Sequence, residues 1–257
     1  MQIKTLGIIG YGSFGSFVHE ITRHYIPDIA VRVYSSRFPT DNTTFFSLED
    51  TCKCDALVLA VPIHAFKSEL ERVLPLLAVN TIIVDIATVK MYTTTILQEY
   101  KYSLRYVAMH PMFGPYSYLK KGRTLAGLRI VLTGHSIMPE EYEVLKKFSK
   151  QLGLVVLETT PEDHDQTLAE TLFLTHYMAQ VITKAGYRRT EIDTVSFGFL
   201  MDAVESVQND TELFQDVFRF NPYCQKVIDQ IDTAEQQVHQ MLAKRSSKAT
   251  VKEQFTQ

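Results

Sequence analysis

The chain has 257 residues, of which 46% are hydrophobic and 21% are charged, so it can build a sizeable core and is not globally disordered. A net charge of −3, from 26 basic and 29 acidic residues, is not typical of a nucleic-acid-binding protein. No apolar run approaches the roughly 18–20 residues of a membrane span, and three cysteines are too few for a disulfide scaffold or a structural zinc site, so we expect no membrane partner and no metal.

The first half of the chain alternates short apolar segments with longer segments of helical periodicity. Strands are expected at residues 5–9, 30–34, 56–61, 81–85, 105–109, 128–132 and 154–157. Helices are expected at residues 14–25 and 64–77. Continuously apolar strands that alternate with helices indicate βαβ units, so we predict an α/β fold with a Rossmann-type, doubly wound and mostly parallel sheet.

The second half contains no clear strand signal. Thr160-Pro161-Glu162-Asp163 combines a capping threonine, a proline at the first helical position and an early acid, which is typical of a helix start. Helices are expected at residues 160–184, 193–208, 211–219 and 222–243. We therefore divide the chain into an α/β domain at residues 1–157, an all-helical domain at 158–243 and a flexible tail at 244–257.

A glycine-rich segment follows the first expected strand. Residues 10–15 read Gly-Tyr-Gly-Ser-Phe-Gly and match G-x-G-x-x-G between a strand and a helix. Gly10 permits the tight turn, Gly12 lets the backbone approach a pyrophosphate, and Gly15 lets the helix pack against the strand. The helix N-terminus, with Ser13 and Phe14, offers free N–H groups to the phosphates. The α/β domain is therefore predicted to bind a dinucleotide.

The end of the second expected strand indicates which dinucleotide binds. NAD-preferring sites usually place an acid there for the ribose 2′-hydroxyl, whereas this chain has Ser35, Ser36 and Arg37. The Arg37 guanidinium can pair with a 2′-phosphate while stacking on the adenine, and the serines can donate hydrogen bonds to the same phosphate. NADP is therefore the predicted cofactor.

A histidine follows the strand expected at residues 105–109. His110 opens the segment His-Pro-Met-Phe-Gly-Pro, residues 110–115, at the carboxyl end of a sheet strand, where open α/β sheets bind ligands. Histidine can act as a general base near neutral pH. His110 is thus the candidate catalytic base.

Residues 110–115 strongly resemble the signature of the prephenate and arogenate dehydrogenase family, the oxidoreductases of tyrosine biosynthesis. Four further segments resemble family segments in the right order: residues 59–62 (Leu-Ala-Val-Pro), 85–90 (Asp-Ile-Ala-Thr-Val-Lys), 162–165 (Glu-Asp-His-Asp) and 174–176 (Leu-Thr-His). The resemblance extends over roughly residues 4–242 and is closest to plant-type arogenate dehydrogenases, which share the form Met-His-Pro-Met-Phe-Gly-Pro.

This resemblance implies an NADP-dependent enzyme of aromatic amino acid biosynthesis that oxidatively decarboxylates a cyclohexadienyl substrate. Hydride leaves ring C4 for the nicotinamide, His110 accepts the proton of the C4 hydroxyl, and the ring carboxylate leaves as carbon dioxide. Thr88 stands where the family commonly has a serine that bonds to this hydroxyl or orients the histidine. Family position also implies that Val61 and Pro62 lie at the cofactor. It further implies that the substrate is bound by Lys90, Gly114 and His176.

The helix expected after residue 160 carries three further polar candidates. Asp165 and His176 lie eleven residues apart, so an ideal helix places them about 20° apart on one face, which suits a helix that lines a cleft. His164 lies off that stripe by roughly 120°, so a structural and a functional role are equally open for it. Lys90 is likewise open between a ligand, a support for its loop and a surface lysine.

A cation should receive the carboxylates of an anionic substrate, and the sequence does not single one out. The candidates are the basic residues of the loop after residue 115 and of the helical half: Lys120, Lys121, Arg123, Arg188, Arg189 and Arg219. The plant-type form and Arg37 favour arogenate over prephenate, and both substrates stay open.

Two other functions stay open. One is an NADP-dependent reductase of the β-hydroxyacid dehydrogenase type, against which residues 110–115 argue. The other is a non-catalytic NADP-binding regulatory protein, for which Thr88 in place of the family's serine and the unassigned cation are the support. The apolar helical half and the resemblance imply a homodimer, and we expect the protein in the cytoplasm or, after removal of a transit peptide, in an organellar stroma.

Overall fold

The structure is a computed structural model that describes residues 3–253, with side chains described up to residue 244. Within these residues one seven-stranded sheet forms, in the order β2-β1-β3-β4-β5-β6-β7. Its strands are β1 Thr5–Ile9, β2 Ala30–Tyr34, β3 Ala56–Leu59, β4 Ile82–Asp85, β5 Arg105–Pro111, β6 Arg129–His135 and β7 Val155–Glu158. Strands β1 to β5 run parallel, and β6 pairs antiparallel with β5, so the predicted Rossmann-type, mostly parallel sheet is confirmed.

Helices cover both faces of the sheet, because successive side chains of each strand point to opposite sides. On one face Leu57 and Leu59 pack against α3 (Phe66–Val73) and α4 (Lys90–Glu99). On the other face Val58 packs with residues of α1 (Ser13–Tyr25) and α6 (Pro139–Gln151). Burial on both faces explains why these strands read as continuous apolar runs. The remaining helical segments of this half are short: α2 Leu48–Cys52, η1 Ile63–Ala65, η2 Leu74–Leu76 and α5 Pro115–Lys120.

Strand β5 extends two residues beyond the end that the sequence predicted. It includes His110, which pairs with Val131 of β6, after an irregularity between Ala108 and Met109. The antiparallel partner β6 prolongs the ladder past the end of the parallel strand β4, and local periodicity does not reveal that partner. His110 is therefore held by strand hydrogen bonds rather than by a loop.

The second half is helical, as predicted. Its elements are α7 Pro161–Leu168, η3 Ala169–Phe173, α8 Leu174–Lys184, α9 Val195–Val207, α10 Thr211–Phe220 and α11 Cys224–Glu253. The Thr160 hydroxyl accepts the Asp163 amide at 3.1 Å, which confirms the predicted helix start. Helix α11 continues past residue 243, where we expected the helical domain to end, and residues 254–257 of the predicted tail lie outside the described residues.

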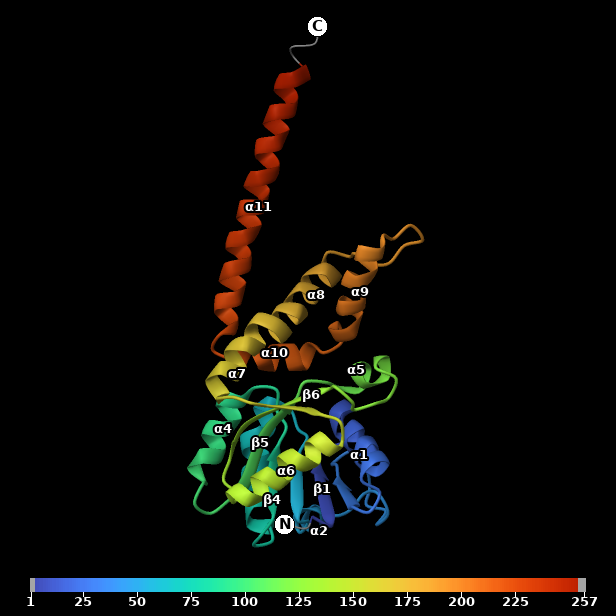
Figure 1. Cartoon of the computed structure of the whole chain (residues 1–257), viewed down its shortest axis with the longest axis vertical. Coiled ribbons are helices and arrows are strands. Elements are labelled where there is room, and N and C mark those ends of the chain that lie inside the picture. The colour runs from blue at the N-terminus through green and yellow to red at the C-terminus, as the bar shows by residue number, and fades with distance from the viewer. Residues whose placement is uncertain (1–2, 254–257) are drawn as a thin grey trace.

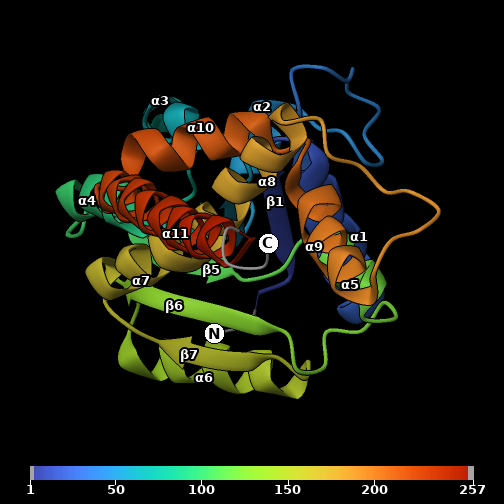
Figure 2. The same ribbon diagram turned by 90° about the horizontal axis from the view of Figure 1, so that it is seen from above.

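The helical half lies over the carboxyl ends of the parallel strands. Figure 1 shows α10 directly above the sheet, α8 and α9 as an antiparallel pair beyond it, and α11 projecting away from both. Figure 2, seen from above, places α8 and α10 over the α2 and β1 region, with β6, β7 and α6 at the opposite edge. None of the described helices is both long and apolar enough to cross a membrane.

Candidate active site

A cleft of about 490 Å³ opens at the carboxyl end of β1, where the chain turns to β2 on one side and β3 on the other. Such a switch point is where open α/β sheets bind ligands. Most of the predicted cofactor residues line it, namely Gly10, Gly12, Ser13, Ser35, Ser36, Arg37, Val61 and Pro62. Glu212 of α10 also lines the cleft, so the helical half contributes to its wall.

The glycine-rich turn has the geometry that a diphosphate requires. Gly10 has a φ of +99°, and a Cβ there would collide with the Ala60 carbonyl; a Cβ at Gly15 would collide with the Gly10 carbonyl. A Cβ at Gly12 would project towards the Arg37 guanidinium, 3.9 Å away. No side chain caps α1 and its first turn contains no acid, so its N–H groups are free for an anion. Phe14 packs edge-on against Phe17 and does not line the cleft, so only its backbone can serve a cofactor.

Arg37 lines the cleft just after the end of β2. Its guanidinium donates to the Tyr11 carbonyl at 2.9 Å, and its amide donates to the Ser35 hydroxyl at 3.3 Å. Ser35 is buried and Ser36 is exposed. No carboxylate pairs with Arg37 among the described residues, so its charge is available to a 2′-phosphate.

Arg72 is a second cation in this cleft, and it was not predicted from the sequence. It lies on α3, over the ring of Tyr34 at 5.1 Å, and pairs with Glu69 at 2.6 Å. Because Glu69 compensates its charge, Arg72 is less available to a phosphate than Arg37. No local motif marks Arg72, since only the packing of α3 beside β2 brings it to the cleft.

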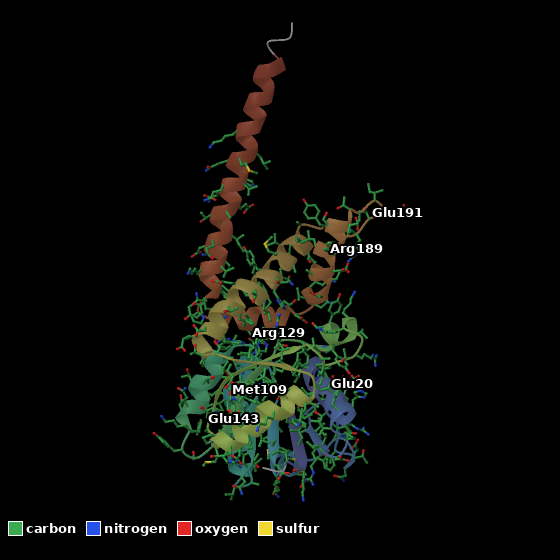
Figure 3. The ribbon with its side chains drawn as sticks, in the orientation of Figure 1. Glu20, Met109, Arg129, Glu143, Arg189 and Glu191 are labelled. Atoms are coloured by element: carbon green, nitrogen blue, oxygen red, sulfur yellow. The ribbon has the colours of Figure 1, made fainter. Side chains whose placement is uncertain are left out.

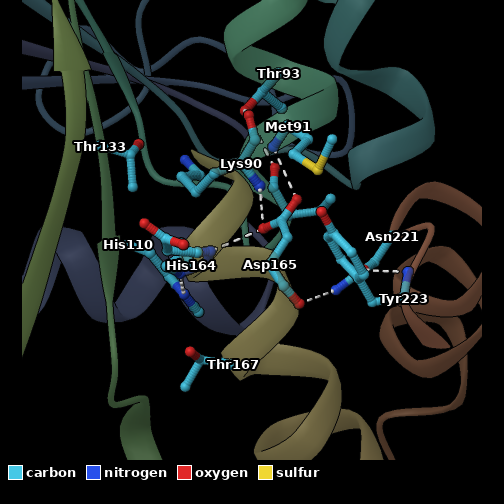
Figure 4. A network of polar contacts seen from close by, with 12 residues as sticks. Lys90, Met91, Thr93, His110, Thr133, His164, Asp165, Thr167, Asn221 and Tyr223 are labelled. Carbon is cyan, nitrogen blue, oxygen red and sulfur yellow. Dashed lines mark hydrogen bonds and ion pairs between the residues drawn. The ribbon is translucent and has the colours of Figure 1, made fainter. Parts of the chain in front are cut away.

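His110 is the first member of a buried chain of three polar side chains (Figure 4). Its Nδ1 lies 3.0 Å from Nε2 of His164, and Nδ1 of His164 lies 2.8 Å from Oδ1 of Asp165. The exposed fractions of the three residues are 6%, 5% and 0%. Nε2 of His110 makes no hydrogen bond within the described part of the chain. The structure therefore places His164 in direct contact with the candidate base.

Asp165 anchors this chain to the start of α4. Its Oδ1 accepts the Lys90 amide and its Oδ2 accepts the Met91 amide, each at 2.8 Å. The Asn221 side chain in turn donates to the Asp165 carbonyl at 2.8 Å. These bonds satisfy N–H groups that a helix N-terminus leaves free, and they fix α7 against the sheet domain.

Lys90 lies inside the protein rather than at its surface. Its side chain is fully buried, with Nζ 2.8 Å from Asp85 and 2.9 Å from the Met109 carbonyl. Burial lowers the pKa of Lys90 while Asp85 acts in the opposite direction. Lys90 ties β4 to the residue before His110, which favours the role of a support for its loop, and the interpretation as a surface lysine is wrong.

The surroundings of His110 disfavour its protonated form. Burial lowers the pKa of His110 well below its usual 6.5, and the His164 ring and the Lys90 ammonium act in the same direction. The imidazole is therefore neutral near pH 7 and offers a lone pair. A neutral histidine with a free ring nitrogen can accept a proton from a ligand hydroxyl.

Thr88 and Gly114 lie on segments that flank His110. Thr88 precedes α4, is half-buried, and its hydroxyl has no hydrogen-bond partner within the described residues. Gly114 caps α5 with φ −135°, and a Cβ there would meet open space. The position of Gly114 therefore leaves room for a ligand.

His176 belongs to a different part of the wall. Its Nδ1 lies 2.9 Å from the Leu172 carbonyl, and its buried Nε2 has no hydrogen-bond partner, with Asp210 3.8 Å away. Its ring is parallel to that of Phe214, at a centroid distance of 6.5 Å. His176 therefore packs against the start of α10, the helix that also places Glu212 in the cleft.

The π-helical turn η3 explains why Asp165 and His176 do not share a face. It lies between them and adds about one residue to the turn, which rotates His176 by on the order of 100° from its ideal position. Asp165 therefore points to α4 and His176 to α10. The shared face expected from an uninterrupted helix is wrong for this reason.

None of the cations proposed for the substrate carboxylates contacts His110 or His164 among the described residues. Arg189 pairs with Asp202 and Glu205, each at 2.7 Å, and Figure 3 shows it near the far end of the α8–α9 pair, well away from Met109. Lys120 and Arg219 lie over aromatic rings, and Arg123 pairs with an acid. Lys121 and Arg188 are exposed.

Two family models match the chain. Residues 40–158 match the model of the prephenate dehydrogenase nucleotide-binding domain, and residues 181–254 match that of a TYRAAT1-like C-terminal domain. The first match contains His110 and the segments around Asp85. The second falls within the helical half.

Curated proteins and solved structures of the same kind are similar over most of the chain. Arogenate dehydrogenase 1, chloroplastic, of Arabidopsis thaliana is 29% identical over 97% of this chain, and arogenate dehydrogenase 2, chloroplastic, is 27% identical over 97%. The chain spans 41% of the length of the first and 73% of the second. A prephenate dehydrogenase from Aquifex aeolicus, solved with hydroxyphenyl propionate and NAD+, has the same fold with a TM-score of 0.71 at 18% identity, over 98% of this chain and 95% of that one.

Proposed function

We propose that this chain is a member of the prephenate and arogenate dehydrogenase family and that it catalyses the NADP-dependent oxidative decarboxylation of a cyclohexadienyl substrate in tyrosine biosynthesis. Arogenate is the favoured substrate, because two relatives are named arogenate dehydrogenases and Arg37 suits the NADP of a plant-type enzyme. The alternative of a β-hydroxyacid dehydrogenase type is less well supported, because the His110 segment lies in the matched family region.

The residues at the switch point suit a nicotinamide dinucleotide, which supplies the hydride acceptor when it is bound. The uncapped start of α1 and the glycine turn would hold the diphosphate. Arg37, with Ser35 and Ser36 beside it, would hold a 2′-phosphate. The chain's own contribution here is binding and orientation.

His110 carries the proposal. It is neutral, buried and held within β5, and its free Nε2 can accept the proton of the substrate's C4 hydroxyl as that carbon loses hydride. The electron pair of the bond to the ring carboxylate then enters the ring, carbon dioxide leaves, and a phenolate forms, which takes the proton back from His110 to give the phenol. Exclusion of water around His110 keeps the proton transfer between substrate and imidazole.

Three further residues are proposed to hold the substrate. The unpartnered hydroxyl of Thr88 would bond to the C4 oxygen, and its extra methyl relative to serine sits on a half-buried position. Gly114 would allow the ring to approach the backbone. The unpartnered Nε2 of His176 would accept a hydrogen bond from the substrate side chain.

A spectrophotometric assay near 340 nm tests this proposal, because only the reduced nicotinamide absorbs there. Arogenate and prephenate are each crossed with NADP and NAD. The proposal expects the fastest rise with arogenate and NADP, accompanied by release of carbon dioxide. Turnover with NAD alone would overturn the cofactor part. Tight NADP binding without turnover of either substrate would favour the non-catalytic regulatory function.

We also propose a homodimer formed through the helical half. The α8–α9 pair exposes large apolar side chains at its tip, and α11 exposes more along its length, for example Ile192 at 91%, Phe199 at 71% and Met241 at 58%. A dimer would bury these surfaces. Light scattering at micromolar concentration should give twice the chain mass of 29.4 kDa, and a mass of one chain would refute the proposal.

The proposed location is the cytoplasm or an organellar stroma. The support for a stroma is that two relatives are named as chloroplastic. A fluorescent fusion to the gene's whole product distinguishes the two compartments, and secretion of the fusion would contradict both.

A further inference from the structure

The chain His110–His164–Asp165 has a definite direction of hydrogen bonding. Asp165 already accepts two amide N–H groups from the start of α4, one on each oxygen, so the carboxylate serves as an acceptor throughout. Nδ1 of His164, 2.8 Å from Oδ1, must then be the donor. A neutral imidazole carries one N–H, so Nε2 of His164 presents its lone pair.

That lone pair determines the state of His110. Nε2 of His164 lies 3.0 Å from Nδ1 of His110, so Nδ1 of His110 must carry the hydrogen and donate it. The lone pair of His110 is thereby placed on Nε2, the nitrogen without a protein partner. The start of α4, through two side chains, decides which nitrogen of His110 is basic.

We propose that His164 and Asp165 are positioning residues that hold His110 in the Nδ1–H tautomer and share the proton that Nε2 takes from the substrate hydroxyl. This inference rests on the proposed function for its substrate, but not for the tautomer. The orienting role matches that of the acid in a serine-protease triad, where the wrong histidine tautomer costs about 10⁴ in kcat.

The proton balance is simple. The substrate O–H bond breaks and an Nε2–H bond forms on His110, while its Nδ1–H bond breaks and an Nε2–H bond forms on His164. His164 keeps its Nδ1–H on Asp165, which stays a carboxylate. The two imidazoles and the carboxylate are neither oxidised nor reduced, and the hydride goes to the nicotinamide of the proposed reaction.

The charges around the two rings favour this transfer. The Lys90 ammonium, which pairs with Asp85 at 2.8 Å, disfavours a positive charge on His110. His164 instead lies beside Asp165, at 2.8 Å. A positive charge is therefore better placed on His164 than on His110, which makes His110 a more effective base than its low pKa alone allows.

Nuclear magnetic resonance of the protein without substrate tests the tautomer directly. Long-range ¹H–¹⁵N correlations of labelled histidine distinguish Nδ1–H from Nε2–H rings, and the chain has 8 histidines, two of which are assigned by His110→Asn and His164→Gln. We expect both His110 and His164 as Nδ1–H tautomers at pH 7. An Nε2–H tautomer at His110 would overturn the inference whether or not the protein turns over any substrate.

Two variants of His164 separate the orienting role from a merely structural one. Glutamine can place a carbonyl oxygen near the Nε2 position, so His164→Gln keeps an acceptor for His110 but takes up no proton. His164→Leu has neither property. We expect His164→Leu to lower kcat by about 10²–10⁴-fold and to move His110 to the Nε2–H tautomer, and His164→Gln to keep the tautomer and to lose roughly tenfold.

In both His164 variants, the substrate KM and the dissociation constant of NADP should change less than about threefold, because His164 does not line the nucleotide cleft. Equal kcat losses with an unchanged His110 tautomer would refute the inference and leave His164 a packing residue. Absence of turnover in the wild-type protein would instead refute the proposed function, while the tautomer spectrum would still decide this inference.

Discussion

Replacing Lys90 with methionine distinguishes a structural lysine from a substrate ligand. Lys90→Met keeps the aliphatic stem but leaves Asp85 without its cation and the Met109 carbonyl without its donor, both in a fully buried place. The Thr93 hydroxyl and the Ala87 amide still bond to Asp85, at 2.6 and 2.9 Å, but they carry no charge. Breaking a buried ion pair costs about 3–5 kcal/mol. In a chain of this size each kcal/mol shifts Tm by about 2–4 °C, so we expect a loss of about 6–20 °C.

Thermal unfolding followed by circular dichroism measures this loss. Lys53→Met is the matched control, because Lys53 forms an exposed pair with Glu49 at 2.7 Å and should lose no more than about 1–2 °C. Removing both partners in Lys90→Met/Asp85→Leu should recover part of the stability. A Tm within about 2 °C of wild type for Lys90→Met, together with a raised substrate KM, would refute the structural role and restore the ligand role.

Three further predictions concern the cofactor, the substrate hydroxyl and pH. Arg37→Ala should raise the dissociation constant of NADP about 10–150-fold, which corresponds to the loss of a charged hydrogen bond worth about 1.5–3 kcal/mol. The dissociation constant of NAD should stay within about threefold. Isothermal calorimetry with both cofactors measures this, and equal losses of affinity would show that Arg37 does not bind the 2′-phosphate. Thr88→Val should lower kcat/KM about tenfold without changing Tm, because its hydroxyl has no protein partner, and an unchanged kcat/KM would exclude it from the site. Because burial lowers the pKa of His110 and the base acts unprotonated, kcat/KM should stay level as pH falls through 6.5 and decline only at lower pH; a decline centred at or above pH 6.5 would contradict this environment.

The sheet could be predicted because its information is local. Val58 and its neighbours form a continuous apolar run, and the glycines at 10, 12 and 15 mark the turn after β1 by spacing alone. The direction of β6 could not be predicted in the same way, because period and composition are the same for parallel and antiparallel strands. His110 was consequently placed after β5 rather than within it.

The site was predicted in part for a related reason. His110 stands in a local segment, whereas the role of His164 depends on how α7 docks onto α4, and Arg72 reaches the cleft only through the packing of α3. The burial of Lys90 could not be predicted because sequence does not reveal depth, although Asp85 lies only five residues before it. The π-helical turn at Ala169–Phe173 leaves no simple signal in the sequence, so ideal helical arithmetic misplaced His176.

The rate of cofactor reduction by His110→Asn, compared with wild type at saturating arogenate and NADP, tests the central claim most directly. Asparagine keeps a polar side chain of similar reach but offers no basic nitrogen. We predict that kcat falls by about 10²–10⁴-fold while the dissociation constant of NADP stays within about threefold, because His110 does not line the nucleotide cleft. Turnover of His110→Asn at the wild-type rate would show that His110 is not the base.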